Sequence, residues 1–99
     1  MFQNKIFNDI VNQHHLIVKY DANKPVFKPE DDEGYIEYKL RLDHIDKQKI
    51  DKMTTQMIYR LNEGKLLTGK YVAYYLIGVD DDGTTGYINK DILLFKIKE

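Results

Sequence analysis

The chain has 99 residues, a formal net charge of −1, 42% apolar and 31% charged residues, and no cysteine. Such a composition is typical of one soluble globular domain, and it excludes a disulfide framework, a cysteine zinc site and a thiolate nucleophile. Because the net charge is so small, any nucleic-acid binding has to come from a local basic patch. No apolar run reaches the roughly 20 residues that span a bilayer, and the first ten residues have neither a signal nor a transit composition. We therefore expect a cytoplasmic protein without a membrane segment.

The N-terminal third is predicted to contain a helix and then a loop. Apolar residues recur at helical spacing in the first dozen residues, which predicts an amphipathic helix within an N-terminal helical segment over residues 1–20. Residues 16–20 fit either a short strand or the last turn of that helix. Two prolines and an acidic run then predict a lead-in loop over residues 21–34, because proline removes a backbone donor and restricts the residue before it.

Residues 35–42 alternate in the way that is typical of a half-buried strand. The apolar face of this strand consists of Ile36, Tyr38, Leu40 and Leu42. The opposite face consists of Tyr35, Glu37, Lys39 and Arg41. We expect this second face to be charged and to point to solvent.

A helix is predicted to follow from about residue 46 to residue 62, with Gly64 as its C-terminal stop. Its apolar positions step by three or four residues and are Ile50, Met53, Met57 and Leu61. We interpret the two methionines as core packing.

Residues 71–87, YVAYYLIGVDDDGTTGY, combine an apolar run with an acidic turn. The run predicts a buried strand at the centre of the sheet, and the three aspartates with Gly83 predict a tight hairpin turn after it. Beyond the hairpin, Asn89 is expected to cap a final helix, whereas the alternation of residues 95–99 predicts a short last strand as the alternative.

Together these elements predict a single α+β (mixed α/β) domain over residues 1–99, with residues 35–99 as its core. We expect a small antiparallel or mixed sheet with two to three helices packed against it.

Residues 64–71, GKLLTGKY, match the spacing of a phosphate-binding P-loop but end in tyrosine where serine or threonine binds magnesium. A predicted helix precedes the segment and a strand follows it, which is the reverse of the P-loop context. We therefore interpret it as a connection in which Lys65 and Lys70 contribute positive charge. The three histidines lack the spacing of metal ligands, and no metal site is predicted from them.

The acidic side chains are open to three interpretations. Asp32 lies five residues before Glu37, and Asp80, Asp81 and Asp82 follow the strand that is predicted to neighbour it. Carboxylates from two such elements can hold a hard divalent cation that supports phosphodiester cleavage. Alternatively, these residues position a partner, or they are only part of an acidic turn without a further role.

Three segments together resemble a known family. They are FKPEDDEGYIEYKLRL at residues 27–42, TTQMIYRLNEG at 54–64 and YYLIGVDDDGTTGYINKD at 74–91. In sequence and order they are similar to the N-terminal region of the GTP-binding protein 1 and 2 family, which are cytosolic, elongation-factor-like translational GTPases. The resemblance implies a non-catalytic accessory domain without a cofactor of its own, with GTP and magnesium expected only in a following GTPase domain.

The partners that this resemblance implies are RNA, the ribosome or the protein's own GTPase domain. On this interpretation cationic side chains meet phosphates while exposed tyrosines stack on bases. The cations are Lys39, Arg41, Lys65 and Lys70. Alternatively the tyrosines simply fill both sides of the sheet; they are Tyr35, Tyr38, Tyr74 and Tyr75.

The same residues are more remotely similar to the Alba-like domain of Schlafen proteins, whose nucleolytic members have a metal-dependent ribonuclease site. By position, this resemblance places the acids of that site at Asp32, Glu37 and Asp81. A metal-dependent ribonuclease is therefore the alternative function. A third possibility is a structural or self-association module in which an exposed strand edge pairs two copies of the chain.

Overall fold

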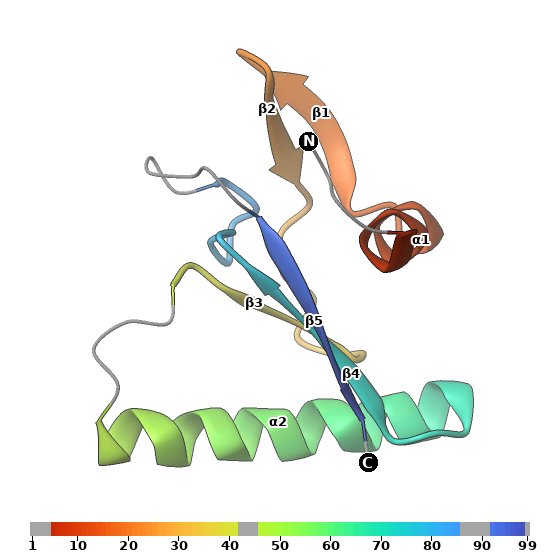
Figure 1. The fold of residues 1–99 in the computed structure, drawn as a ribbon, viewed down its shortest axis with the longest axis vertical. Helices are drawn as coiled ribbons and strands as arrows, with labels where there is room; N and C mark the ends of the chain where they lie inside the picture. The colour runs from red at the N-terminus through yellow and green to blue at the C-terminus, as the bar shows by residue number, and fades with distance from the viewer. Residues whose placement is uncertain (1–4, 42–45, 86–91, 99) are drawn as a thin grey trace.

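The computed structural model of the protein describes residues 5–41, 46–85 and 92–98. In chain order, the elements within these ranges are α1 (Lys5–Gln13), β1 (Ile17–Asp21), β2 (Lys24–Phe27), β3 (Ile36–Lys39), α2 (Lys47–Thr68), β4 (Val72–Ile77) and β5 (Leu93–Lys98) (Figure 1). The described strands form two small sheets, one of β1 and β2 and one of β3, β4 and β5. The predicted α+β class is confirmed.

The three-stranded sheet is mixed, with β4 in the middle. β3 pairs with β4 in parallel, so that Ile36 lies opposite Tyr74, and α2 makes the crossover that a parallel pair requires. β5 pairs with β4 in the antiparallel direction. Every residue of β4 is buried except Ile77, which is half-buried. The prediction that this apolar run forms the centre of the sheet is confirmed.

The long helix α2 begins and ends at recognisable caps. The Asp46 carboxylate accepts a hydrogen bond from the backbone N–H of Lys49 at 2.7 Å, and Gly69, with φ of +84°, donates its N–H to the carbonyl of Lys65 at 3.0 Å. The predicted stop at Gly64 is wrong, because the helix continues through it to Thr68. Gly64 is a site of close approach instead, since a Cβ there would collide with the backbone carbonyl of Val72 in β4.

The N-terminal region contains more strand than the sequence predicted. The helix over residues 1–20 is wrong beyond Gln13, because the chain turns at His15, with φ of +53°, and enters β1. The short-strand alternative for residues 16–20 is thereby confirmed. The prediction of a loop over residues 21–34 is wrong at Lys24–Phe27, because these residues form β2. This strand pairs with β1 and accommodates Pro25 in a two-stranded ribbon.

The C-terminal region resolves the choice between a helix and a strand for residues 93–98. These residues form β5, so the strand alternative is confirmed and a helix over them is wrong. Asn89, the expected helix cap, lies outside the described residues.

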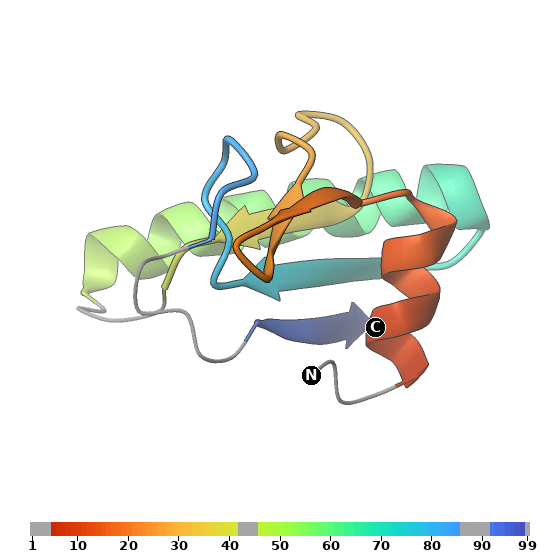
Figure 2. The same cartoon turned by 90° about the horizontal axis from the view of Figure 1, so that it is seen from above.

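The sheet lies between the two helices (Figure 2). On one face, α2 packs on β3 and β4. On the other face, one apolar core joins α1, the β1–β2 ribbon and alternate residues of β4. Its buried members are Phe7, Ile10, Val11, Leu16, Phe27, Tyr35, Tyr38, Val72, Tyr74, Leu76 and Val79. In the described part of the chain, neither helix combines the length and the apolar character that crossing a membrane requires.

Candidate nucleic-acid interface

The carboxylates of the ribonuclease alternative lie in different surroundings. Asp32 and Asp81 are exposed, whereas Glu37 is only 6% exposed. Asp81 lies in the predicted hairpin turn, where the backbone N–H of Asp80 donates to the carbonyl of Thr84 at 2.8 Å. Within residues 5–41, 46–85 and 92–98, no three acidic or histidine side chains are placed to hold a metal ion. The convergence that the ribonuclease alternative requires is therefore not found there.

Glu37 is instead half of a buried ion pair, so the prediction of a solvent-facing charged side of β3 is wrong at this residue. The Nε of Arg60, on α2, donates to Glu37 Oε1 at 2.8 Å, and Arg60 is only 3% exposed. The rest of the guanidinium donates to three backbone carbonyls at 2.8 to 2.9 Å, those of Asp31, Glu33 and Gly34. We call this arrangement the Arg60 latch. It fastens the 31–34 loop to α2.

A second acid, the half-buried Glu30, lies beside the latch. Glu30 Oε2 accepts the backbone N–H of Tyr38 at 2.6 Å and is 3.7 Å from Arg60 Nη2. Burial raises the pKa of Glu30 to about 7, and repulsion from Glu37 and Asp81 adds to the increase, while the Tyr38 N–H and Arg60 oppose it. Near neutral pH this carboxyl is therefore divided between its protonated and ionised forms.

The four predicted cations do not form one cluster. Lys39 and Arg41 lie at the C-terminal end of β3, and Lys39 Nζ donates to Gln56 Oε1 at 2.6 Å and lies 3.9 Å from Glu37 Oε2. Lys65 and Lys70 flank the start of β4, and the parallel register places them at the opposite end of the sheet. The structure therefore divides the predicted patch into two separate pairs.

The four tyrosines predicted as exposed stacking platforms are buried. None of Tyr35, Tyr38, Tyr74 and Tyr75 is more than 8% exposed. The alternative interpretation, in which they fill both sides of the sheet, is confirmed. Tyr71 is 38% exposed and was not singled out by the sequence.

Lys65 and Lys70 line a groove in which the chain gathers positive charge. Its volume is about 720 Å³, and its lining residues are Ile10, Gln13, Tyr35, Lys65, Thr68, Lys70, Tyr71, Val72, Tyr74, Lys96 and Lys98. We call this surface the basic groove. The end of α2 supplies Lys65, the turn at Gly69 leads into Lys70, and antiparallel pairing places Lys96 and Lys98 opposite Tyr74 and Val72.

The groove contains positive charge, which attracts phosphates, and an aromatic ring, on which a base can stack. Of residues 5–41, 46–85 and 92–98, four lysines line the groove and no aspartate or glutamate does. Lys65 Nζ lies 5.3 Å from the centre of the Tyr71 ring and donates to the Gly69 carbonyl at 3.0 Å. In the described part of the chain, no carboxylate pairs with the ammonium groups of Lys70, Lys96 or Lys98. An anion entering the groove would therefore meet positive charge that no ion pair between described residues neutralises.

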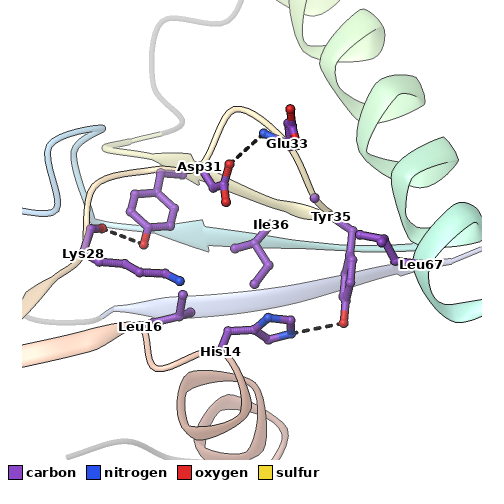
Figure 3. A pocket seen from close by; sticks show the side chains of 10 residues that line it. His14, Leu16, Lys28, Asp31, Glu33, Tyr35, Ile36 and Leu67 are labelled. Atoms are coloured by element: carbon purple, nitrogen blue, oxygen red, sulfur yellow. Dashed lines mark hydrogen bonds between the residues drawn. The ribbon is translucent and has the colours of Figure 1, made fainter.

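A smaller cavity has Tyr35 in common with the lining of the groove. Figure 3 shows the side chains that line this cavity. Its volume is about 200 Å³, and it is lined by His14, Leu16, Lys28, Asp31, Glu33, Gly34, Tyr35, Ile36, Tyr38 and Leu67. The ring nitrogen Nε2 of His14 lies 3.1 Å from the hydroxyl of Tyr35. Burial lowers the pKa of His14, and the positive charges of Lys28 and His15 lower it further, so the imidazole is neutral at pH 7. We call this space the small cavity.

Sequence reasoning missed Arg60 and the two lysines of β5. Arg60 falls in the apolar stripe of α2, three residues after Met57 and seven after Met53, and a lone arginine in such a stripe is a signal for a buried partner. Lys96 and Lys98 alternate with apolar residues in the last strand, which identifies one polar face but not its neighbours.

Comparison with known proteins gives two kinds of relative. Uncharacterized protein R625 of Acanthamoeba polyphaga mimivirus is 36% identical over 91 residues, which cover 89% of this chain and 47% of the viral protein. GTP-binding protein 2 of mouse and of human is 43% identical over 61 residues, which cover 62% of this chain and 9% of that protein. No family model and no solved structure matches the chain.

The chain thus spans about half the length of the viral relative and about a tenth of GTP-binding protein 2. Over the matched residues, the identity supports a relationship between this chain and part of a GTP-binding protein. The predicted resemblance is confirmed to that extent.

Proposed function

We propose that the chain is a non-catalytic RNA-binding domain of an elongation-factor-like GTP-binding protein, and that the basic groove is its RNA-binding surface. The observation that carries the proposal is the composition of the groove. Among the residues that the structure describes, four lysines and an exposed tyrosine line one concave surface, and no acidic side chain lines it. RNA carries one negative charge per phosphate, so such a surface attracts it irrespective of sequence.

The rest of the chain makes this concentration of charge informative. The formal net charge is −1, so the positive potential of the groove arises from the arrangement of lysines and not from a basic composition. The exposed acids Asp80, Asp81 and Asp82 lie in the hairpin turn, and none of them lines the groove. The acids of this turn and the lysines of the groove therefore lie on different parts of the surface, which helps to orient an approaching polyanion.

The relationship to GTP-binding protein 2 supports the wider setting of the proposal. In that setting the domain presents RNA, including ribosomal RNA, to a nucleotide-binding unit elsewhere in the protein. GTP and magnesium belong to that other unit. A contact between this domain and the GTPase unit is the outcome that remains if RNA does not bind.

Binding to RNA can be measured by the fluorescence anisotropy of a labelled single strand and a labelled duplex at several salt concentrations. If four lysines each neutralise one phosphate, log Kobs for the single strand falls with log salt with a slope of about −3. The test variant is Lys70→Glu/Lys96→Glu in the groove. The matched control is Lys19→Glu/Lys52→Glu, which changes the net charge equally at exposed positions outside the groove.

We expect the groove variant to lose most of its RNA affinity at low salt and to show a slope shallower by about 1.4. The control variant should retain most of the RNA affinity and most of the salt slope of the wild type. Absence of binding to either RNA at low salt would refute the proposal. Equal losses in the two variants would show that net charge, and not the groove, determines binding.

A further inference from the structure

The basic groove and the small cavity have one lining residue in common and border the same end of α2. Tyr35 belongs to both, and the last turns of α2 border both, with Lys65 and Thr68 on the groove and Leu67 on the cavity. Leu67 is 61% exposed, so this rim of the cavity is open to solvent. A strand of RNA whose phosphates follow the lysines passes Tyr35, the residue that the two spaces share.

The lining of the cavity differs in chemistry from that of the groove. Its apolar walls come from Leu16, Ile36 and Leu67, while Asp31 and Lys28 add an acceptor and a donor. The carboxylates of Asp31 and Glu33 repel a phosphate at this position. A planar group with apolar faces and a polar edge suits the space better, because its faces contact the walls while its edge meets the charged side chains.

We propose that the small cavity binds one unpaired nucleobase of an RNA whose backbone lies in the basic groove. The proposal rests on the RNA-binding function proposed above and specifies its substrate as single-stranded RNA. In a duplex the bases are stacked and paired, so none can enter a side pocket, whereas an unpaired base can be turned out and read at its edge.

The charged groups also specify which bases fit. Adenine, cytosine and guanine each carry an exocyclic amino group, which donates to a carboxylate such as that of Asp31. Their ring nitrogens or carbonyls accept from an ammonium group such as that of Lys28. Uracil offers a carboxylate only its ring N3–H, and the two carbonyl oxygens that flank this donor repel the carboxylate. We therefore expect the cavity to prefer a base with an exocyclic amino group over uracil.

The 31–34 loop holds its part of the cavity wall in a fixed position. Asp31 Oδ1 accepts the backbone N–H of Glu33 at 3.0 Å, and the Gly34 N–H donates to Glu63 Oε1 on α2 at 2.9 Å. The Arg60 latch fixes the carbonyls of the same loop. The acceptor is thus placed before any ligand arrives, which lowers the entropic cost of binding.

The test compares labelled single strands of adenosine and of uridine, about ten nucleotides long, with a duplex of the same length. Leu67→Trp places a large ring on the rim of the cavity. Leu66→Trp is the matched control, because Leu66 is the adjacent residue, is 77% exposed and does not line the cavity. Asp31→Asn keeps an oxygen for the Glu33 N–H but removes the charge that would meet the amino group.

We expect the wild type to bind the adenosine strand at least fivefold more tightly than the duplex or the uridine strand. Leu67→Trp should abolish this preference without changing duplex affinity, and Leu66→Trp should leave it intact. Asp31→Asn should reduce the ratio of adenosine to uridine affinity, even if lower repulsion strengthens binding to both strands.

Equal affinity for single strand and duplex, or equal behaviour of the two tryptophan variants, would refute the base-binding cavity while leaving the basic groove as an RNA surface. Both proposals would be supported if the wild type preferred the single strand and the groove variant lost all RNA binding. If no RNA binds the wild type at low salt, both proposals fail.

Discussion

Replacement of Arg60 by methionine tests whether one buried ion pair fastens the 31–34 loop to the helix. The guanidinium donates to Glu37 at 2.8 Å and to three loop carbonyls, and both charged residues are at most 6% exposed. Arg60→Met leaves the Glu37 carboxylate buried without its main partner and leaves the carbonyls unpaired. Breaking a buried pair in this way costs about 3–5 kcal/mol. We expect a loss of that size in the free energy of unfolding, measured by urea titration.

Two further variants distinguish the contribution of the ion pair to stability from the effect of replacing a side chain. Arg60→Met/Glu37→Met removes both charges, so its cost should be smaller than the sum of the two single costs, with the difference measuring the coupling. Lys47→Met is the surface control. Lys47 Nζ lies 2.9 Å from Asp51 Oδ2, but the two side chains are 88% and 64% exposed. This control should lose less than about 1 kcal/mol.

If Arg60→Met cost no more than Lys47→Met, or if the two buried substitutions were additive in the double variant, the Arg60 latch would not be a source of stability. The denaturant slope m should stay constant across the series, since a change in m would report an altered unfolded or native state instead of a lost interaction. Arg60→Lys provides a further check. It keeps the charge but loses the planar fork, so we expect a stability between those of the wild type and Arg60→Met.

Substitutions at Glu30 and at Gly64 test the structure independently. The pKa of Glu30 is raised from 4.5 to about 7 in the folded state, so the native chain holds this proton more tightly than the unfolded chain, and stability should fall as pH rises from about 4.5 through 7. Glu30→Gln should therefore melt at a higher temperature than the wild type at pH 8 but not at pH 4.5, and an unchanged pH dependence would contradict the assignment. Gly64→Ala should cost about 2–3 kcal/mol, because its Cβ meets the Val72 backbone, whereas Gly34→Ala has open space and should cost about 1 kcal/mol from its positive φ. Equal costs in urea titration would show that close packing does not require Gly64.

The central strand and the long helix were predictable because their signals are local. β4 consists of apolar and aromatic residues without polar interruption, which is the pattern of a strand buried on both faces. The stepping of apolar residues likewise indicated that α2 begins near residue 46. The helix end was misplaced because a glycine within a helix and a glycine after one look alike in sequence. Only the position of β4 distinguishes them.

The burial of Glu37 was not predictable from its strand. Alternation assigns Glu37 to a polar face, and a polar face usually points to solvent. Whether another element covers that face depends on a partner 23 positions away, Arg60, whose five-donor guanidinium makes the burial possible. The basic groove has the same origin. Its lysines come from α2, the turn at Gly69 and β5, and the pairing of β5 with β4 brings them together.

The latch and the proposed binding surface meet at the 31–34 loop. From one side, Arg60 fixes the loop carbonyls to α2; on the other side, Asp31, Glu33 and Gly34 line the small cavity. The lysines of the basic groove are held by the end of α2 and by the sheet, so they do not depend on the latch. It follows that a substitution that breaks the Arg60 latch should reduce selectivity among bases more than it reduces affinity for the RNA backbone. Affinity for RNA and selectivity among bases are therefore separable properties of this fold, because different parts of it keep the two sets of side chains in place.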